Sequence, residues 1–381
     1  MEISKIMKLE EIYNKSKDSE RDFEHKSILF IGSESYDAPT ITVLQGLDQL
    51  GFNIYTIKKP NINSWFCNQI VKDIDDLKFD FVLSNLHWGT RWSYYKKYNH
   101  ELESYMKILI DGDDNINLGS WRNKYDYYTR NYTYNPPESI KDLNLMPYRW
   151  VEPLYDYKPD LVFTSQKQFN DNDSVYLPFG LHEQYRTFFK AKKTFDREID
   201  FAHIPGPGIK RENMARLIGK LSRFNILPGE IHNSYVRGEK IVPESIKHNV
   251  LNDDNIHSYH RWIMNKSYFE VLNNSKVLIY PGIDKWPFWD SKRPWEGYAS
   301  GCLVLMSKPC IDVSEYPLTE ICDYAVYNSY FDFIKKWQYL YKNPSFLDEL
   351  RVKAFKNAIK YFSPKPIANY YLMRIKDHNE A

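Results

Sequence analysis

Residues 276–306 read KVLIYPGIDKWPFWDSKRPWEGYASGCLVLM, in which apolar runs at 276–280 and 302–306 flank a polar loop and an amphipathic segment. A helix is predicted over residues 294–300, because Pro294 is suited to opening a helix and Gly301 to ending one. Strand, loop, helix, glycine and strand in this order are typical of a parallel βαβ unit. This stretch therefore predicts an α/β fold for the C-terminal half.

The same alternation occurs along the rest of the chain. Further strands are predicted at residues 27–31, 52–57, 79–84, 106–110 and 161–165, the last of the N-terminal half, and at residues 199–204. Helices are predicted at residues 211–223, 267–273, 330–341 and 344–361, with a final helix after Ser363-Pro364. Alternating strands and helices form parallel sheets, so we expect two sequential α/β domains with a ligand cleft between them and a boundary near residues 186–197.

Composition excludes several classes of protein. Of the 381 residues, 43% are hydrophobic and 27% charged, which is typical of a globular chain rather than a disordered one. The formal net charge of +1 provides no overall field that would favour nucleic acid. Residues 1–25 are charged throughout, and no apolar run reaches about 18 residues, so neither a signal peptide nor a membrane span is predicted. We expect a soluble, cytoplasmic protein.

Two residue types are informative by their number and spacing. Aromatic residues make up 16% of the chain, enough to supply both a core and stacking surfaces for sugar rings or bases. The cysteines form no CxxC pair and show no spacing typical of metal ligands, which favours reduced thiols that act as small apolar side chains. The four are Cys67, Cys302, Cys310 and Cys322.

Arg293 and Glu296 are three residues apart, so they share one face of the helix predicted at residues 294–300. The beginning of a helix offers free N–H groups and a positive dipole to a diphosphate, and an arginine there can bind phosphate through two hydrogen bonds. A glutamate one turn later can accept both ribose hydroxyls. The alternative is an ordinary surface ion pair.

Arg293-x-x-Glu296, followed by Ala299-Ser300-Gly301-Cys302 and an apolar strand, resembles the donor-binding signature of GT-B glycosyltransferases. The similarity is closest to bacterial spore-protein-type members of families 1 and 4 and to the DNA β-glucosyltransferases of T-even phages. It covers residues 199–306 best and only the general layout of the rest. The resemblance implies two Rossmann-like domains facing each other across a cleft, and transfer of a sugar from a UDP-linked donor to an acceptor hydroxyl.

The resemblance also implies the domain roles. Residues 1–25 form a polar helix and tether, and residues 26–183 an acceptor-binding Rossmann-like domain. Residues 184–362 form the nucleotide-sugar-binding domain, and residues 363–381 a helix that packs back on the N-terminal domain. The location is then the cytoplasm of a bacterium or of a phage-infected host.

Other donor-binding residues are predicted beside the Arg293 motif. The strand at residues 199–204 leads into Gly206 and Gly208, whose backbone N–H groups can approach phosphates, and into Lys210 and Arg211, which add positive charge. Two prolines in this loop depart from the family pattern and remove possible donors. Asp284 and Lys285 are expected to face the sugar. GT-B enzymes stabilise the leaving diphosphate by a helix dipole and cations, so no tightly bound cofactor and no divalent metal are expected.

An inverting mechanism is expected, because Phe288 stands eight residues before Glu296, where many retaining members carry a glutamate. Inversion requires a general base on the acceptor side. Asp111 follows an apolar strand, and neighbouring Asp113 would raise its pKa toward the useful range. Asp113 is itself an alternative base, and so are Glu34 and His87, which follow other strands of the same predicted sheet.

The acceptor stays open among a glycan, a protein, a small molecule and a hydroxymethylated base in DNA, and the sequence predicts no oligomeric state. A base in DNA would have to be exposed or flipped to react. A different class of function is a non-transferring nucleotide-sugar-binding or epimerase-like module. Arg211, Arg293 and Glu296 are expected of both classes, so only an acceptor-side base distinguishes them.

Overall fold

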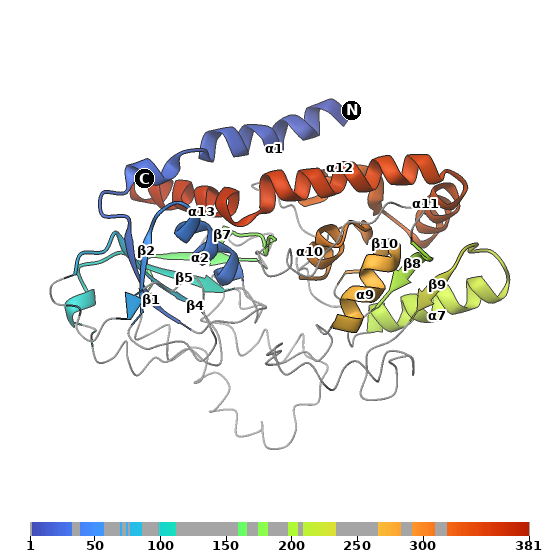
Figure 1. Ribbon diagram of the computed structural model, residues 1–381, viewed down its shortest axis with the longest axis horizontal. Coiled ribbons are helices and arrows are strands. Elements are labelled where there is room, and N and C mark those ends of the chain that lie inside the picture. Colours follow the sequence, from blue (N-terminus) through green and yellow to red (C-terminus); the bar gives the residue numbers. More distant parts are fainter. Residues whose placement is uncertain are drawn as a thin grey trace, which may run out of the picture. The chain divides into compact units, whose positions relative to one another are not determined.

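The computed structural model describes residues 2–32, 39–56, 69–70, 74, 77–85, 98, 100–111, 159–165, 174–181, 197–204, 209–233, 266–282, 292–308 and 318–380. The chain divides into two compact units, each built on its own sheet (Figure 1). Unit 1 consists of Met1–Glu11, Gly180–Asp284 and Phe288–Ser363. Unit 2 consists of Ile12–Phe179, Lys285–Pro287 and Pro364–Ala381.

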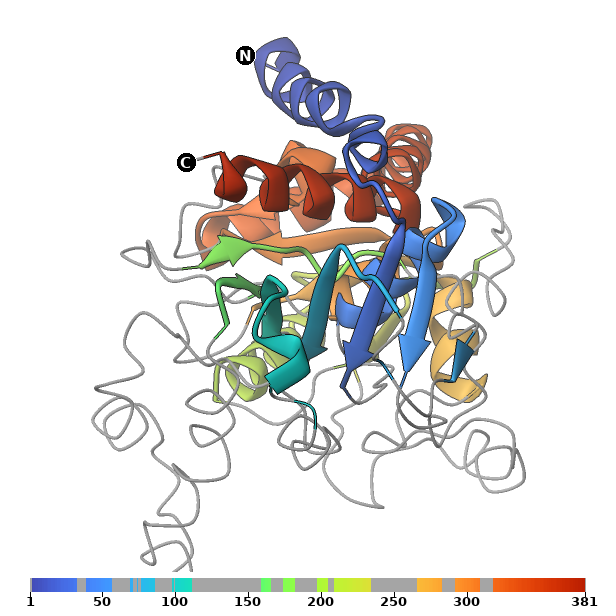
Figure 2. The ribbon, with the colours of Figure 1, turned by 90° about the vertical axis from the view of Figure 1, so that its left-hand side faces the viewer.

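Unit 2 contains a seven-stranded sheet in which all described pairings are parallel, so the strands end at one edge (Figure 2). The strand order is β3-β2-β1-β4-β5-β6-β7. The chain runs from β1 outward to β3 and then returns to the other side of β1, which makes the gap between β1 and β4 a topological switch point. The strands are β1 (Ser27–Ile31), β2 (Asn53–Thr56), β3 (Gln69–Ile70), β4 (Phe81–Asn85), β5 (Lys107–Asp111), β6 (Leu161–Thr164) and β7 (Val175–Tyr176).

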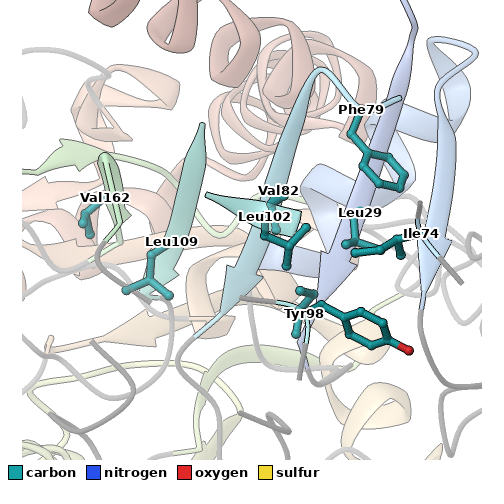
Figure 3. Packing of buried hydrophobic residues seen from close by; sticks show 9 residues of the cluster. Leu29, Ile74, Phe79, Val82, Tyr98, Leu102, Leu109 and Val162 are labelled. Carbon is teal, nitrogen blue, oxygen red and sulfur yellow. The ribbon is translucent and has the colours of Figure 1, made fainter. Parts of the chain in front are cut away.

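The central strands of unit 2 are apolar on both faces because both faces are covered. On one face, Leu29, Val82, Leu109 and Val162 project from neighbouring strands into a single buried cluster (Figure 3). On the other face, Phe163 lies against Tyr371, with 4.5 Å between ring centroids.

Helix α13 (Pro364–Asn379) brings the end of the chain onto the sheet of unit 2. It packs against α2 (Pro39–Gln49), where a Cβ added to Gly46 would lie only 2.1 Å from the carbonyl oxygen of Pro364. Tyr370 donates a hydrogen bond from its hydroxyl to the carbonyl of Tyr176, at 3.0 Å. Glycine at position 46 therefore permits the close approach of these helices.

Unit 1 contains a five-stranded parallel sheet of order β12-β11-β10-β8-β9. Its strands are β8 (Ile199–His203), β9 (Ile231–Asn233), β10 (Ser275–Tyr280), β11 (Leu303–Ser307) and β12 (Val326–Tyr327). Its α-helices are α7 (Ile209–Arg223), α9 (Lys266–Asn274), α10 (Lys292–Ala299), α11 (Tyr330–Lys342) and α12 (Pro344–Phe362). Phe201 of β8 stacks on Trp337 of α11, with ring centroids 3.6 Å apart.

The remaining described elements are α1 (Glu2–Ser16) and the 3-10 helices η1 (Ser19–Asp22), η6 (Leu318–Ile321) and η7 (Asp323–Ala325). Within the described part of the chain, no helix combines the length and the apolar character that crossing a bilayer requires.

The predicted α/β class is confirmed by the two parallel sheets. Two details of the prediction are wrong. Residues 161–165 do not form the last strand of the N-terminal half, because β7 follows and pairs with β6. Helix α10 begins at Lys292 and not at Pro294, since proline is tolerated anywhere in the first turn, where no N–H partner is needed.

Candidate functional site

The switch point of the sheet in unit 1 lies between β8 and β10. From β8 the chain crosses through α7 to β9 on one side, whereas β10, β11 and β12 follow on the other side. Ligands of open parallel sheets bind outside the carboxyl ends of the strands at such a point. His203 is the last residue of β8, and Gly282, with a φ of 81°, follows β10.

Arg211 spans this switch point. It lies in the first turn of α7, and its Nε donates a hydrogen bond to the carbonyl oxygen of Gly282 at 3.3 Å. The contact joins the helix that follows β8 to the segment that follows β10. A guanidinium group is thereby held where the beginning of a helix also presents N–H groups, an arrangement suited to a phosphate.

His203 is fully buried at the same switch point, and the sequence analysis missed it. Its Nδ1 lies 3.0 Å from Oδ1 of Asn233, whose Nδ2 donates to the carbonyl of Ala215. The asparagine oxygen therefore faces the imidazole, which places the histidine proton on Nδ1. Burial lowers the pKa of His203 to about 4, and the charge of Arg211 acts in the same direction against the Asn233 hydrogen bond. The imidazole is neutral at pH 7.

The lowered pKa of His203 predicts a loss of stability in acid. Because protonation favours the unfolded chain, the contribution of His203 is complete above pH 6.5 and is lost as the pH falls from 6.5 toward 4. His203→Asn should unfold in urea with a free energy that depends less on pH in this window than that of the wild type. His232→Asn is the matched control, because His232 lies on the neighbouring strand and is less buried. This variant should reduce the pH dependence of the free energy of unfolding by less. If the free energy of unfolding depends on pH equally in His203→Asn and in the wild type, the pKa of His203 is not lowered as described.

Arg293 and Glu296 form a buried ion pair on α10. The exposed fractions of these residues are 7% and 0%, and Nη1 of the arginine lies 3.3 Å from Oε2 of the glutamate. The alternative of a surface ion pair is therefore wrong. Desolvating two charges is expensive, so a buried pair adds little to stability by itself.

Helix α10 is fitted closely to the sheet that it follows. A Cβ added to Gly297 would lie 2.7 Å from Cδ2 of Leu278 in β10 and 2.8 Å from Cγ2 of Val304 in β11. On α10 itself, Trp295 is buried against Phe362 of α12, with ring centroids 4.8 Å apart. The Arg293–Glu296 pair therefore sits on a rigid element.

The sequence-predicted donor residues fall into two groups. Arg211, Arg293 and Glu296 are described and lie in unit 1, on the helices that follow β8 and β10. Lys210 belongs to α7, but its side chain is outside the described residues. Four further predicted positions also lie outside the described residues: Gly206, Gly208, Asp284 and Lys285.

On the acceptor side, Asp111 is the last residue of β5, where it pairs with Thr164 of β6. Its side chain and the whole of Asp113, Glu34 and His87 lie outside the described residues. Asp111 therefore has the backbone position that the sequence predicts, at the carboxyl edge of the sheet in unit 2.

Asn85 is a buried polar residue at the switch point of unit 2 that sequence reasoning missed. It ends β4 with an exposed fraction of 1%. A Cβ added to Gly32, directly after β1, would lie 2.5 Å from Oδ1 of Asn85, so the amide occupies the space that a side chain would need. Ser84 donates a hydrogen bond from its hydroxyl to the carbonyl of Ile31 at 2.5 Å, which closes β4 onto β1.

Among the described residues, no cluster of three or more histidine, cysteine, aspartate or glutamate side chains is suited to a metal ion. Both described cysteines, Cys302 and Cys322, are free and buried. Burial raises the pKa of the Cys302 thiol despite two nearby arginines, and it raises that of Cys322 to about 11.

These raised pKa values predict unreactive thiols, because the thiolate is the nucleophile. Iodoacetamide should alkylate peptides containing Cys302 or Cys322 only after the chain is unfolded in urea. Peptide mass mapping after native and denaturing alkylation measures this directly. Alkylation of either residue in the native chain at the rate of a free thiol would contradict the burial described above.

The fold and the site together define a two-unit α/β chain whose switch point in unit 1 carries cationic and carboxylate side chains. No family model and no curated relative matches the sequence. Many solved structures resemble the chain, and the three described below do so at low sequence identity. The T4 phage β-glucosyltransferase in complex with UDP and Mn²⁺ is 12% identical with a TM-score of 0.42, covering 93% of this chain and 99% of the other.

An α-glucosyltransferase in complex with UDP-glucose and DNA containing an abasic site is 11% identical with a TM-score of 0.48, covering 88% and 96%. Sucrose-phosphate synthase from Thermosynechococcus elongatus is 10% identical with a TM-score of 0.42, covering 93% and 98%. The first of the three is a phage enzyme of the kind that the Arg293 motif resembles.

Proposed function

We propose that the chain is a glycosyltransferase that moves a sugar from a nucleotide-sugar to an acceptor hydroxyl. The observation that carries this proposal is the buried Arg293–Glu296 pair on α10, in the unit whose switch point is spanned by Arg211. A buried charge pair on a rigid helix beside the carboxyl ends of parallel strands supports recognition of a polar, charged ligand. The order of residues in the motif supports a nucleoside diphosphate.

The donor residues have distinct roles in this proposal. Arg211 and Arg293 bind the diphosphate, whose charge they neutralise as it leaves, and Glu296 accepts hydrogen bonds from the ribose hydroxyls. Gly206, Gly208 and Lys210 contribute to the phosphate site, and Asp284 and Lys285 contact the sugar. UDP is the proposed nucleotide.

The proposed reaction is a single displacement with inversion. The acceptor hydroxyl oxygen forms a bond to the anomeric carbon while the bond between that carbon and the diphosphate oxygen breaks, and UDP leaves. The hydroxyl proton passes to the carboxylate of Asp111, which acts as general base, with Asp113 and Glu34 as the alternatives. The cationic side chains supply the charge stabilisation in this scheme, so the proposed reaction requires no divalent metal and persists in EDTA.

A nucleotide panel tests the donor class. UDP, GDP, ADP and their sugars are compared by thermal shift, and slow hydrolysis of the sugar is followed by nucleotide release, with and without EDTA. UDP-sugars should raise the Tm most, and Glu296→Gln should reduce the shift while the variant stays folded by circular dichroism. Acceptors, including hydroxymethylated DNA, are then screened by mass spectrometry. If no nucleoside diphosphate raises the Tm of the wild type, the proposed function is wrong.

A further inference from the structure

Two buried guanidinium groups donate hydrogen bonds to backbone carbonyls at the carboxyl end of α10. Arg197, two residues before β8, has an exposed fraction of 3%. Its Nη2 donates to the carbonyl of Ser300 at 2.7 Å, and its Nη1 donates to the carbonyls of Leu272 and Ser275. Leu272 lies in the last turn of α9, Ser275 follows α9 and Ser300 follows α10, so one side chain joins the ends of two helices.

The second guanidinium comes from α12. Arg351 has an exposed fraction of 4%, and its Nε donates to the carbonyl of Gly301 at 2.8 Å. Its Nη1 lies 3.0 Å from Oδ1 of Asp348, a half-exposed carboxylate one turn earlier. Burial lowers the pKa of Arg351 to about 10, with the charge of Arg197 acting in the same direction, so the group remains protonated at pH 7.

The negative ends of two helices compensate these buried cations. The last carbonyls of a helix have no partner within the helix, and they carry the negative end of its dipole. Arg197 and Arg351 together bind the carbonyls of Ser300 and Gly301, directly after the last residue of α10. Gly301 has a φ of 72°, a backbone conformation that favours glycine, and a Cβ there would lie close to the Arg197 guanidinium, at 3.0 Å from Nη2.

Helix α10 is short, so its two ends move together. It has 8 residues and is therefore about 12 Å long. Gly297 fixes its middle against β10 and β11, and the two arginines fix its carboxyl end. Arg293 and Glu296 lie on the same helix, between its first residue and Gly297.

We infer that Arg197 and Arg351 are positioning residues: they hold the carboxyl end of α10 and thereby set the location of Arg293 and Glu296 in the donor site. The inference rests on the proposed function, because it assigns to α10 the binding of the nucleotide. Neither arginine is required to touch the ligand. A displacement of about 1 Å in a binding helix is enough to weaken a site whose groups must meet a diphosphate and a ribose together.

The test compares nucleotide affinity with stability in matched variants. Arg197→Met and Arg351→Met should weaken UDP binding by about tenfold or more in calorimetry at a temperature where circular dichroism shows the variants folded. Arg197→Lys and Arg351→Lys keep a cation but lose the planar fork, and they should weaken binding less. With a turnover assay, KM for the donor should rise more than kcat falls. If a methionine variant does not fold, the UDP affinity of the corresponding lysine variant is compared with that of the wild type instead.

Lys276→Met is the matched control. Lys276 is another largely buried cation of unit 1 near the amino ends of β10 and β8, but its ammonium pairs with Asp200, whereas Arg197 and Arg351 bind the carbonyls that follow α10. This variant should lower the free energy of unfolding in urea and leave the affinity for UDP unchanged.

The outcomes separate the two proposals. If the wild type binds no nucleoside diphosphate, the proposed function fails. If the wild type binds UDP and the arginine variants bind it equally well while losing stability as Lys276→Met does, the arginines are structural only and the positioning role is overturned. Weaker binding by the arginine variants, with unchanged affinity in Lys276→Met, supports the positioning role.

Discussion

Replacing Asp111 with asparagine is expected to lower turnover by about 10²–10⁴-fold, the usual contribution of a general base. Asp111 ends β5 at the carboxyl edge of the sheet in unit 2, so its backbone belongs to a regular element of the fold. Asparagine keeps the shape of the side chain but cannot take the proton of the acceptor hydroxyl. The affinity for UDP should barely change, because the nucleotide is assigned to unit 1. Turnover on the acceptor found by screening, together with UDP calorimetry, measures both.

The control for Asp111 is a carboxylate at the opposite end of the same strand pair. Asp160 accepts a hydrogen bond from the backbone N–H of Lys107, the first residue of β5, at 2.7 Å. Asp160→Asn should leave turnover within a few-fold of the wild type. Near-normal turnover in Asp111→Asn would transfer the role to Asp113 or Glu34, tested by Asp113→Asn and Glu34→Gln. The anomeric configuration of the product, read by NMR, should be inverted relative to the donor.

Arg293→Ala is expected to weaken UDP binding by about 2–3 kcal/mol, or roughly 30–150-fold, through loss of charge-assisted hydrogen bonds to phosphate. The same change leaves Glu296 with its carboxylate buried and its arginine partner removed, so the free energy of unfolding should fall by about 3–5 kcal/mol. Glu296→Gln should mainly weaken recognition of the ribose, so its affinity for UDP and 2′-deoxy-UDP should become similar. Calorimetry and urea unfolding on the same samples measure the effects.

A double substitution separates binding from stability at this pair. Arg293→Met with Glu296→Met removes both charges, and replacing a buried pair by apolar side chains is often neutral or stabilising. The double variant should regain the stability that Arg293→Ala loses, yet bind UDP as weakly. If it binds UDP with wild-type affinity, the pair is structural and the donor site lies elsewhere.

The longer strands of the fold could be predicted because they are buried on both faces and appear as continuous apolar runs. The strands β1 and β11 lie within a residue of their predicted bounds. The short strands β3 and β12 have two residues each and carry no periodicity that a sequence could reveal. The start of α10 was misplaced because Pro294 is compatible with the third position of a helix as well as the first.

The candidate site was predictable where its residues are close in sequence. The i, i+3 spacing placed Arg293 and Glu296 on one face, although their burial depends on packing that spacing does not encode. Arg197 was missed because its partners are backbone carbonyls 75 or more residues away, which leave no side-chain pattern. His203 offered a weak signal, a polar residue within the predicted strand at residues 199–204.

Hydrogen–deuterium exchange with and without a UDP-sugar tests the central claim most directly, because it locates the ligand on the chain. Saturating UDP-glucose should slow exchange in peptides that contain the start of α7, around Arg211, and the start of α10, around Arg293. Exchange in peptides from β5 and β6 in unit 2 should slow less when no acceptor is present. Protection confined to unit 2, or none in the peptides that contain Arg211 and Arg293, would contradict a donor site at the switch point of unit 1.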